Sequence, residues 1–165
     1  MITFIYPRDD WTAAETIMKM QALAASQGYS VYATPKNTIR DMDYIKIELS
    51  KTRYAIFIAI DADSIDDDTN YELSFLKDKN IETYYVVTEE FRKQLPEIDD
   101  NRVYVYEKKD PQALIESVNK TLRDIKNKDK EEISGKESNA GELMALLAIL
   151  GILAFFLWLL FGKRD

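Results

Sequence analysis

The stretch Tyr54-Ala-Ile-Phe-Ile-Ala-Ile60 carries no charge and runs directly into the acidic segment Asp61–Asp68. A continuous apolar run of this length is typical of a strand that is covered on both faces, as in a parallel sheet. The flanking sequence agrees, because β-rich runs alternate with segments of helical periodicity. We expect strands over residues 2–6, 29–33, 54–60, 82–87 and 103–106 and helices over residues 12–27, 39–51, 69–79, 89–95 and 111–126.

Strands that alternate with helices predict an α/β fold, here a five-stranded, mainly parallel, doubly wound sheet. Local signals support the helix boundaries. Thr12 and Glu15 form a capping-box pattern, Gly28 follows a helix end, and either Asp68 or Thr69 is placed to cap the helix after the acidic segment.

Composition limits the chemistry. The chain of 165 residues has no cysteine and no histidine, which excludes disulfides, thiolate nucleophiles, Ser-His-Asp triads and ordinary zinc sites. The net charge of −7 disfavours DNA or RNA as a partner, because phosphate neutralisation needs a basic face. Asp61, Asp63 and Glu72 fall at three calcium-loop positions, but Asp66 stands where that loop requires glycine, so we expect neither a metal nor a cofactor.

Doubly wound sheets bind ligands beyond the carboxyl ends of their strands. The segments expected there begin at Pro7, Thr34, Asp61 and Thr88. The expected ligand-binding residues include an aromatic ring that could stack on a base and an arginine suited to phosphate, and they are Pro7, Arg8, Trp11, Pro35, Asp61 and Asp63. A surface aromatic that covers the sheet end is the alternative for Trp11.

The succession of Tyr6-Pro7, Gly28–Pro35, Leu49–Asp61 and Asp66-x5-Glu72-Leu73 resembles the nucleoside 2-deoxyribosyltransferases and the related TIR domains of bacterial defence and signalling. The resemblance covers roughly residues 2–90 and implies a flavodoxin- or TIR-like sheet. It also implies catalytic roles for three residues: Glu72 as nucleophile, Asp66 at the sugar hydroxyl and Tyr6 against the nucleophile.

The chain departs from that family pattern at several positions. Asp68 and Asn70 stand where the transferases have glycines, and Arg53 replaces an aspartate before the long apolar strand. Three aspartates around Glu72 would raise its pKa and repel phosphate unless a cation intervenes. We therefore expect a fold that keeps its pocket and has lost the reaction.

The C-terminal stretch Leu143–Phe161 is uncharged and free of proline. With Gly162 included, it reaches roughly 30 Å as a helix, which is the hydrocarbon thickness of a bilayer. We expect a domain over residues 1–126, a charged linker over 127–141 and a single transmembrane helix over 142–162. Lysines before the span modestly outnumber the Lys163-Arg164 pair after it, which favours a cytoplasmic N-terminal domain.

Small residues in the span fall on one side of the predicted helix, at Ala145, Ala148 and Gly151, and would permit homo-oligomeric packing. The leading interpretation is a single-pass membrane effector in signalling or antiphage defence that binds a nucleotide-type ligand and oligomerises at the lipid bilayer. A tail-anchored N-glycosidase or deoxyribosyltransferase that uses Glu72, and a non-catalytic scaffold, are the alternatives.

Overall fold

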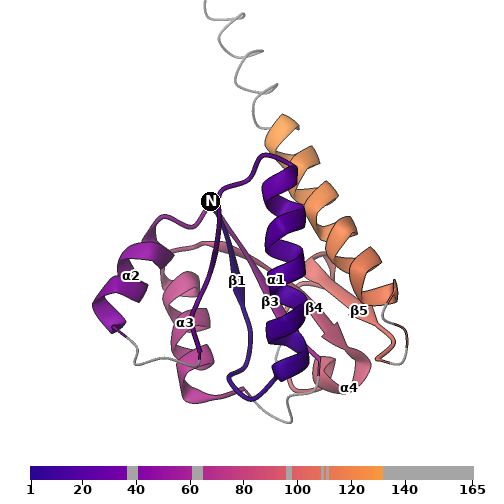
Figure 1. Cartoon of the computed structure of the whole chain (residues 1–165), viewed down its shortest axis with the longest axis horizontal. Coiled ribbons are helices and arrows are strands. Elements are labelled where there is room, and N and C mark those ends of the chain that lie inside the picture. Colours follow the sequence, from indigo (N-terminus) through magenta and orange to yellow (C-terminus); the bar gives the residue numbers. More distant parts are fainter. Residues whose placement is uncertain (37–40, 61–64, 96–97, 109, 111, 132–165) are drawn as a thin grey trace, which may run out of the picture. The chain divides into compact units, whose positions relative to one another are not determined.

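The computed structural model describes residues 1–36, 41–60, 65–95, 98–108, 110 and 112–131. Five strands form one parallel sheet in the order β2-β1-β3-β4-β5 (Figure 1). The strands are β1 (Ile2–Ile5), β2 (Val31–Ala33), β3 (Tyr54–Ala59), β4 (Glu82–Thr88) and β5 (Val103–Tyr106). Every pairing is parallel, so the α/β prediction is confirmed and the sheet is wholly rather than mainly parallel.

The helices are α1 (Trp11–Ser26), α2 (Met42–Ser50), α3 (Asp67–Asp78) and α4 (Glu89–Arg92), with a 3-10 turn at Asp100–Arg102. Residues 112–131 are also helical, so the predicted last helix continues into the first residues of the predicted linker. The chain divides into two compact units, Met1–Arg123 and Asp124–Asp165.

The direction of the crossovers places helices on both faces of the sheet. The chain moves outward from β1 to β2 through α1, and then returns past β1 to β3 through α2. Since parallel crossovers are right-handed, these opposite directions put α1 and α2 on opposite faces. Figure 1 shows α1 on one face, with α2 and α3 on the other.

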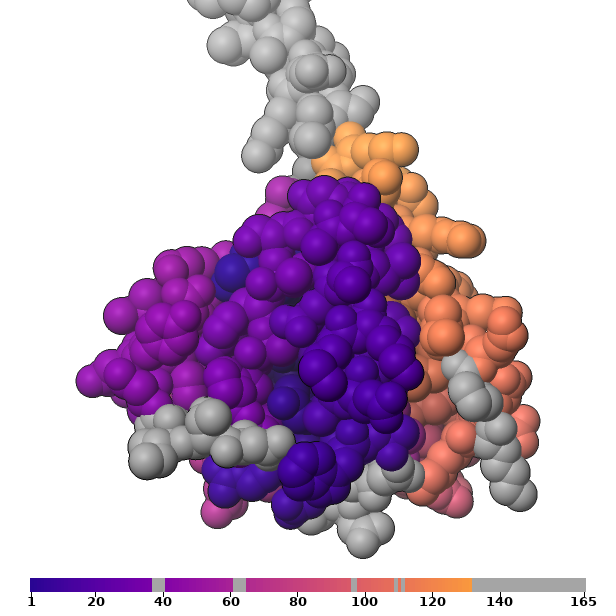
Figure 2. All heavy atoms as spheres, in the orientation of Figure 1, coloured from indigo at the N-terminus to yellow at the C-terminus, as the bar shows by residue number. Residues whose placement is uncertain are grey.

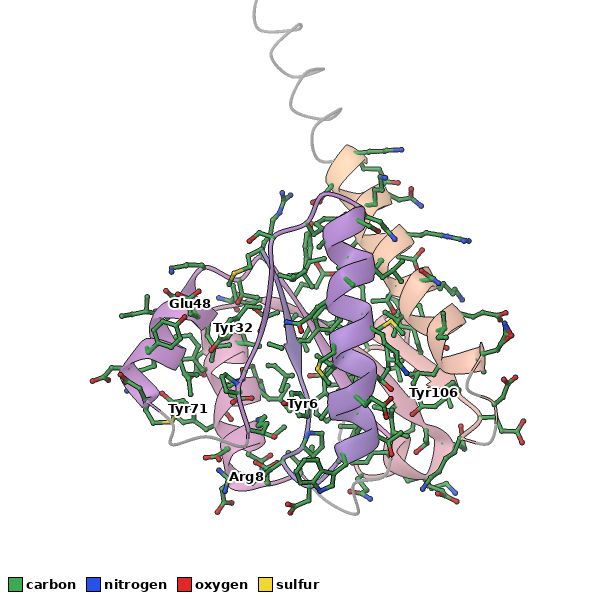
Figure 3. The ribbon with its side chains drawn as sticks, in the orientation of Figure 1. Tyr6, Arg8, Tyr32, Glu48, Tyr71 and Tyr106 are labelled. Carbon is green, nitrogen blue, oxygen red and sulfur yellow. The ribbon has the colours of Figure 1, made fainter. Side chains whose placement is uncertain are left out.

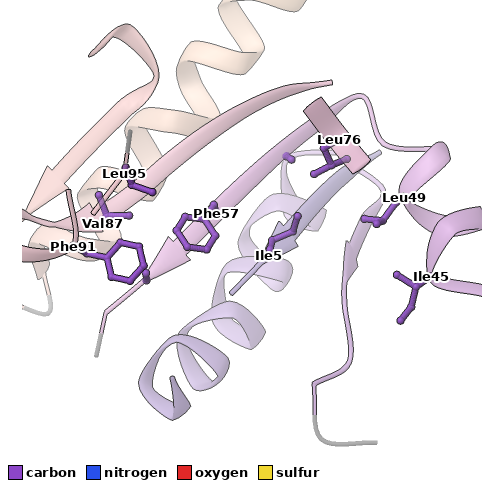
Figure 4. Packing of buried hydrophobic residues seen from close by; sticks show 10 residues of the cluster. Ile5, Ile45, Leu49, Phe57, Leu76, Val87, Phe91 and Leu95 are labelled. Carbon is purple, nitrogen blue, oxygen red and sulfur yellow. The ribbon is translucent and has the colours of Figure 1, made fainter. Parts of the chain in front are cut away.

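The sheet core follows from the period of two along each strand. Ile5 and Phe57 face the α2 and α3 side, where they pack with Ile45, Leu49 and Leu76 (Figure 4). Residues one position away, such as Phe4 and Ile56, are equally buried on the α1 side. All six residues of β3 are buried, which confirms the prediction that the apolar run beginning at Tyr54 is covered on both faces of the sheet.

Helix starts differ from the expected caps. The N-cap of α1 is Asp10 rather than Thr12, and the N-cap of α3 is Asp66 rather than Asp68 or Thr69. In both helices an earlier carboxylate accepts from a first-turn amide that has no partner within the helix, which is the general function of an N-cap. The sequence offers several aspartates, and tertiary contacts described below select these two.

The predicted span over 142–162 lies outside the described residues. None of the helices in the described part of the chain combines the length and the apolarity needed to cross a bilayer.

Candidate functional site

The loops after β1 and β3 separate at the carboxyl edge of the sheet, because α1 and α3 lie on opposite faces. Asp10 connects them. Its Oδ1 accepts from the amide of Ala13 at 2.8 Å, and its Oδ2 accepts from the amide of Ile60, directly after β3, at 2.5 Å. Its side chain is fully buried. One carboxylate thus caps α1 and fixes the spacing of the two loops at the point where strand order reverses.

Asp66 makes the corresponding connection from α3. Its Oδ2 accepts from the amide of Arg8 at 2.6 Å, and its Oδ1 accepts from the amide of Thr69 at 2.9 Å. The guanidinium of Arg8 also forms an ion pair with Asp68. The loop after β1 is therefore attached to the first turn of α3 by both the backbone and the side chain of Arg8. Figure 3 shows Tyr6 and Arg8 just beyond the end of β1.

A buried ion pair lies beneath this connection. Lys36 Nζ, from the loop after β2, is 2.8 Å from Oε2 of Glu72 in α3, and both side chains are fully buried. Lys36 also donates to Thr69 Oγ1 at 3.1 Å, and its Nζ lies 5.7 Å from the centre of the Tyr6 ring. An ammonium over an aromatic face is attracted by the ring quadrupole.

Thr69 links the contacts of Asp66 to those of the Lys36–Glu72 ion pair. Its Oγ1 lies 2.8 Å from Asp66 Oδ2 and 3.1 Å from the carbonyl oxygen of Tyr6. Since a hydroxyl carries one proton, Thr69 accepts from Lys36 and donates to one of these two oxygens. The network therefore runs from the exposed Arg8 to the enclosed Glu72 through Asp66, Thr69 and Lys36.

The electrostatics of Asp66 follow from these contacts. Partial burial by itself would raise the pKa of Asp66, but hydrogen bonds from the Arg8 amide and from the amide and hydroxyl of Thr69 outweigh it. The positive charge of Lys36 acts in the same direction, so the pKa of Asp66 lies below its ordinary value of 3.8. A carboxylate that accepts several hydrogen bonds is stabilised in its ionised form.

The arrangement limits what Glu72 can do. A carboxylate nucleophile must reach the anomeric carbon of a bound sugar. In the structure Glu72 has no exposed surface and its Oε2 is held by Lys36. Attack by Glu72 would therefore require Lys36 to withdraw and the pair to become accessible.

The structure brings together the three residues that the resemblance named as catalytic, Tyr6, Asp66 and Glu72, around Lys36 and Thr69. The predicted ligand-binding residues have different exposures. Pro7 is buried, Arg8 and Pro35 are exposed, and Trp11 is 69% exposed at the first position of α1. The remaining predicted residues lie outside the described residues, namely Asp61, Asp63, Ala145, Ala148 and Gly151.

Sequence reasoning missed Lys36, Thr69 and Asp10 as members of the site. Lys36 had a usable signal, because it stands directly after β2 in a loop already assigned to the carboxyl edge. A carboxylate that is enclosed at this edge requires a cation, and Lys36 supplies it. Asp10 and Thr69 had no comparable signal, since their partners are 50 and 63 residues away in the chain.

The outer surface of the site is acidic. Arg8 is accompanied by Asp9, Asp66, Asp67 and Asp68, whereas Lys36 is balanced by Glu72. This surplus of carboxylates disfavours a bare polyphosphate and favours a neutral or cation-bound ligand. Within the described ranges, no group of three or more acidic residues is arranged to hold a metal ion.

Comparison of the chain with protein-family models, with curated proteins and with solved structures gave no match.

Proposed function

We propose that the chain is a single-pass membrane effector whose α/β domain binds a nucleotide-type ligand and whose assembly acts at the bilayer. The observation that carries the proposal is the set of Tyr6, Arg8, Lys36, Asp66 and Glu72 at the point where strand order reverses. Open α/β sheets bind their ligands at such points.

The apolar stretch Leu143–Phe161 supports the proposed membrane anchor. A transmembrane helix over 142–162 would tether the domain, with the domain on the cytoplasmic side. Ala145, Ala148 and Gly151 would form the contact between spans in a homo-oligomer. A role in signalling or antiphage defence is the biological setting that the family resemblance suggests.

One observation favours binding over catalysis. Glu72, the only candidate nucleophile that the resemblance names, is enclosed and paired with Lys36. A ligand at this edge would contact the exposed Arg8 loop and Pro35, with Lys36 and Glu72 supporting the loop from below. The acidic surroundings favour the nucleoside part of the ligand, or a phosphate that carries a divalent cation.

The enzymatic alternative, an N-glycosidase or deoxyribosyltransferase, is favoured by one observation. Tyr6, Asp66 and Glu72 are linked within one network, as the resemblance implies for a catalytic set.

The experiment uses the full chain in detergent micelles with NAD, a nucleoside panel and cyclic oligonucleotides, each with and without Mg²⁺. A rise in Tm without base release supports the binding function, because a ligand of the native state stabilises it by mass action. Arg8→Ala should abolish the rise, whereas Lys77→Ala, which removes an exposed cation from the last turn of α3, should keep it. Base release that is lost in Glu72→Gln would instead establish the enzymatic alternative. If no ligand raises Tm and no base is released, the non-catalytic scaffold is the remaining hypothesis.

A second experiment addresses the anchor. Full-length protein should remain with membranes after carbonate washing and be released by detergent. Gly151→Leu should weaken crosslinking between spans without changing membrane retention. Recovery of the unaggregated full chain in the aqueous fraction would contradict the anchor.

A further inference from the structure

The two cations of the candidate site, Lys36 and Arg8, are held in different ways. Lys36 and Glu72 are both fully enclosed, so separating them would leave a buried charge without its partner. The ion pair between Arg8 and Asp68 lies at the surface, with the two side chains 48% and 29% exposed. Water can therefore solvate both groups when they separate. Of the two cations, Arg8 is the one that can exchange its partner for another anion.

The backbone of Arg8 is held separately from its side chain. The amide donates to Oδ2 of Asp66 at 2.6 Å, whereas the guanidinium pairs with Asp68. Loss of the ion pair would thus release the side chain and leave the loop after β1 attached to α3. In Figure 2, the indigo surface of the N-terminal part of the chain reaches the lower edge of the domain, where magenta atoms of α3 adjoin it, and Figure 3 labels Arg8 at the same edge.

Asp68 keeps a favourable position when it loses Arg8. It lies in the first turn of α3, directly after Asp67 and the N-cap Asp66. The partial positive charge at the N-terminus of a helix stabilises a carboxylate in that turn. An exposed ion pair also contributes little net free energy, so the exchange costs an incoming anion little.

A phosphate group is a suitable replacement for the carboxylate of Asp68. It can make the same two parallel hydrogen bonds to a guanidinium that a carboxylate makes, and a terminal phosphate carries a larger negative charge. The carboxylate of Asp68 thus occupies the group of Arg8 that a phosphate would bind.

We propose that Asp68 is a specificity-determining residue, which occupies the guanidinium of Arg8 until the phosphate of a bound nucleotide displaces it. This inference rests on the proposed function, because it takes Arg8 as a ligand contact. Pairing with Asp68 lowers the affinity for an anionic ligand in proportion to the fraction of Arg8 side chains that are occupied, and it leaves the affinity for a neutral nucleoside unchanged. Asp68 therefore shifts the preference of the site from nucleotides toward nucleosides.

The first test measures how fast Arg8 reacts with an arginine-selective dicarbonyl reagent, in the full chain in detergent micelles, by peptide mass spectrometry. Arg8 should react roughly two- to fivefold faster in Asp68→Asn than in wild type, which is the range expected when an exposed ion pair is removed. The Arg92–Asp100 ion pair is the internal reference, because the substitution does not touch it.

Asp67→Asn is the matched control. Asp67 is an exposed neighbour in the same turn of α3, and its substitution changes the net charge by the same amount. Arg8 should react in Asp67→Asn at nearly the wild-type rate. Equal acceleration in the two variants, with unchanged circular dichroism, would overturn the proposal, because the effect would then come from net charge and not from the ion pair.

The second test uses inorganic pyrophosphate as the anionic probe. Pyrophosphate should protect Arg8 from the reagent, and half-protection should require a roughly two- to fivefold lower concentration in Asp68→Asn than in Asp67→Asn. Half-protection at the same concentration in both variants, or protection in neither, would overturn the proposal.

These measurements contain no nucleoside, so their outcome is separate from the thermal-shift experiment. Protection by pyrophosphate in the expected order, together with no rise in Tm from any nucleotide, would keep Asp68 as a competitor for Arg8 and reject the nucleotide-binding function. A rise in Tm from a nucleotide that is equal in Asp68→Asn and Asp67→Asn would keep that function and reject the role of Asp68.

Discussion

Lys36 Nζ lies 2.8 Å from Glu72 Oε2, and neither side chain has any exposed surface. The two residues come from the loop after β2 and from the second turn of α3, so the contact fixes α3 relative to the sheet edge. Desolvation of two charges offsets most of their attraction, which makes such a pair a weak source of net stability but a strong constraint on the arrangement.

The first prediction concerns this pair. Lys36→Met should lower the free energy of unfolding by roughly 3–5 kcal/mol, because it leaves a buried carboxylate without its cation. The double variant Lys36→Met/Glu72→Leu should recover most of that loss. Urea denaturation of the full chain in micelles, followed by circular dichroism, measures both.

A matched control for the pair is Lys51→Met. It breaks the Lys51–Glu48 ion pair, whose lysine side chain is 55% exposed, and should change stability by less than about 1 kcal/mol. The single variant Glu72→Leu completes the double-mutant cycle. If the loss of unfolding free energy in the double variant equals the sum of the losses in the two single variants, the two side chains are not coupled.

The second prediction concerns Asp10. Asp10→Ala should lower the free energy of unfolding by about 2–4 kcal/mol, since it removes the α1 cap and leaves the buried amide of Ile60 without this acceptor. Asp41→Ala, which removes only the exposed cap of α2, should cost about 1 kcal/mol. Equal losses in the two variants, measured by urea denaturation, would show that the contact with Ile60 contributes nothing.

The third prediction is a pH dependence. The pKa of Asp66 is lower in the folded chain than its ordinary value of 3.8, so its ionised form stabilises the fold above that pH. The contribution is lost as pH falls through the lowered folded pKa, because the unfolded chain binds the proton more readily. The decrease in stability below about pH 4 should therefore be shallower in Asp66→Asn than in wild type.

The measurement for Asp66 is a series of urea denaturations between neutral and strongly acidic pH. Thr69→Val removes one of the hydrogen bonds that lower the pKa and should give an intermediate slope. If the free energy of unfolding falls with decreasing pH at the same slope in wild type and Asp66→Asn, Asp66 does not contribute to the pH dependence of stability.

The fourth prediction concerns Thr34, at the end of β2. Its hydroxyl is fully buried and has no hydrogen-bond partner among the described residues. Thr34→Val should leave stability unchanged or raise it, because an unpaired buried hydroxyl carries a desolvation penalty that a methyl group avoids. A loss above about 1 kcal/mol in thermal or urea unfolding would reveal an acceptor or donor for that hydroxyl.

The amino-acid sequence by itself determined the order of elements and the buried centre of the sheet. The uncharged, β-rich run Tyr54–Ile60 favoured a strand covered on both faces, and β5 was predicted with its observed bounds. These features depend on neighbouring residues in the chain, where composition and periodicity are sufficient.

Tertiary structure decided the strand order, the helix caps and the partners of the site. Asp66 rather than Asp68 caps α3 because it also accepts from the Arg8 amide, 58 residues away. Glu72 is paired because the crossover from β2 to β3 brings Lys36 over α3, a contact separated by 36 residues. No local pattern encodes these choices, since each depends on which loops the right-handed crossovers bring to one edge of the sheet.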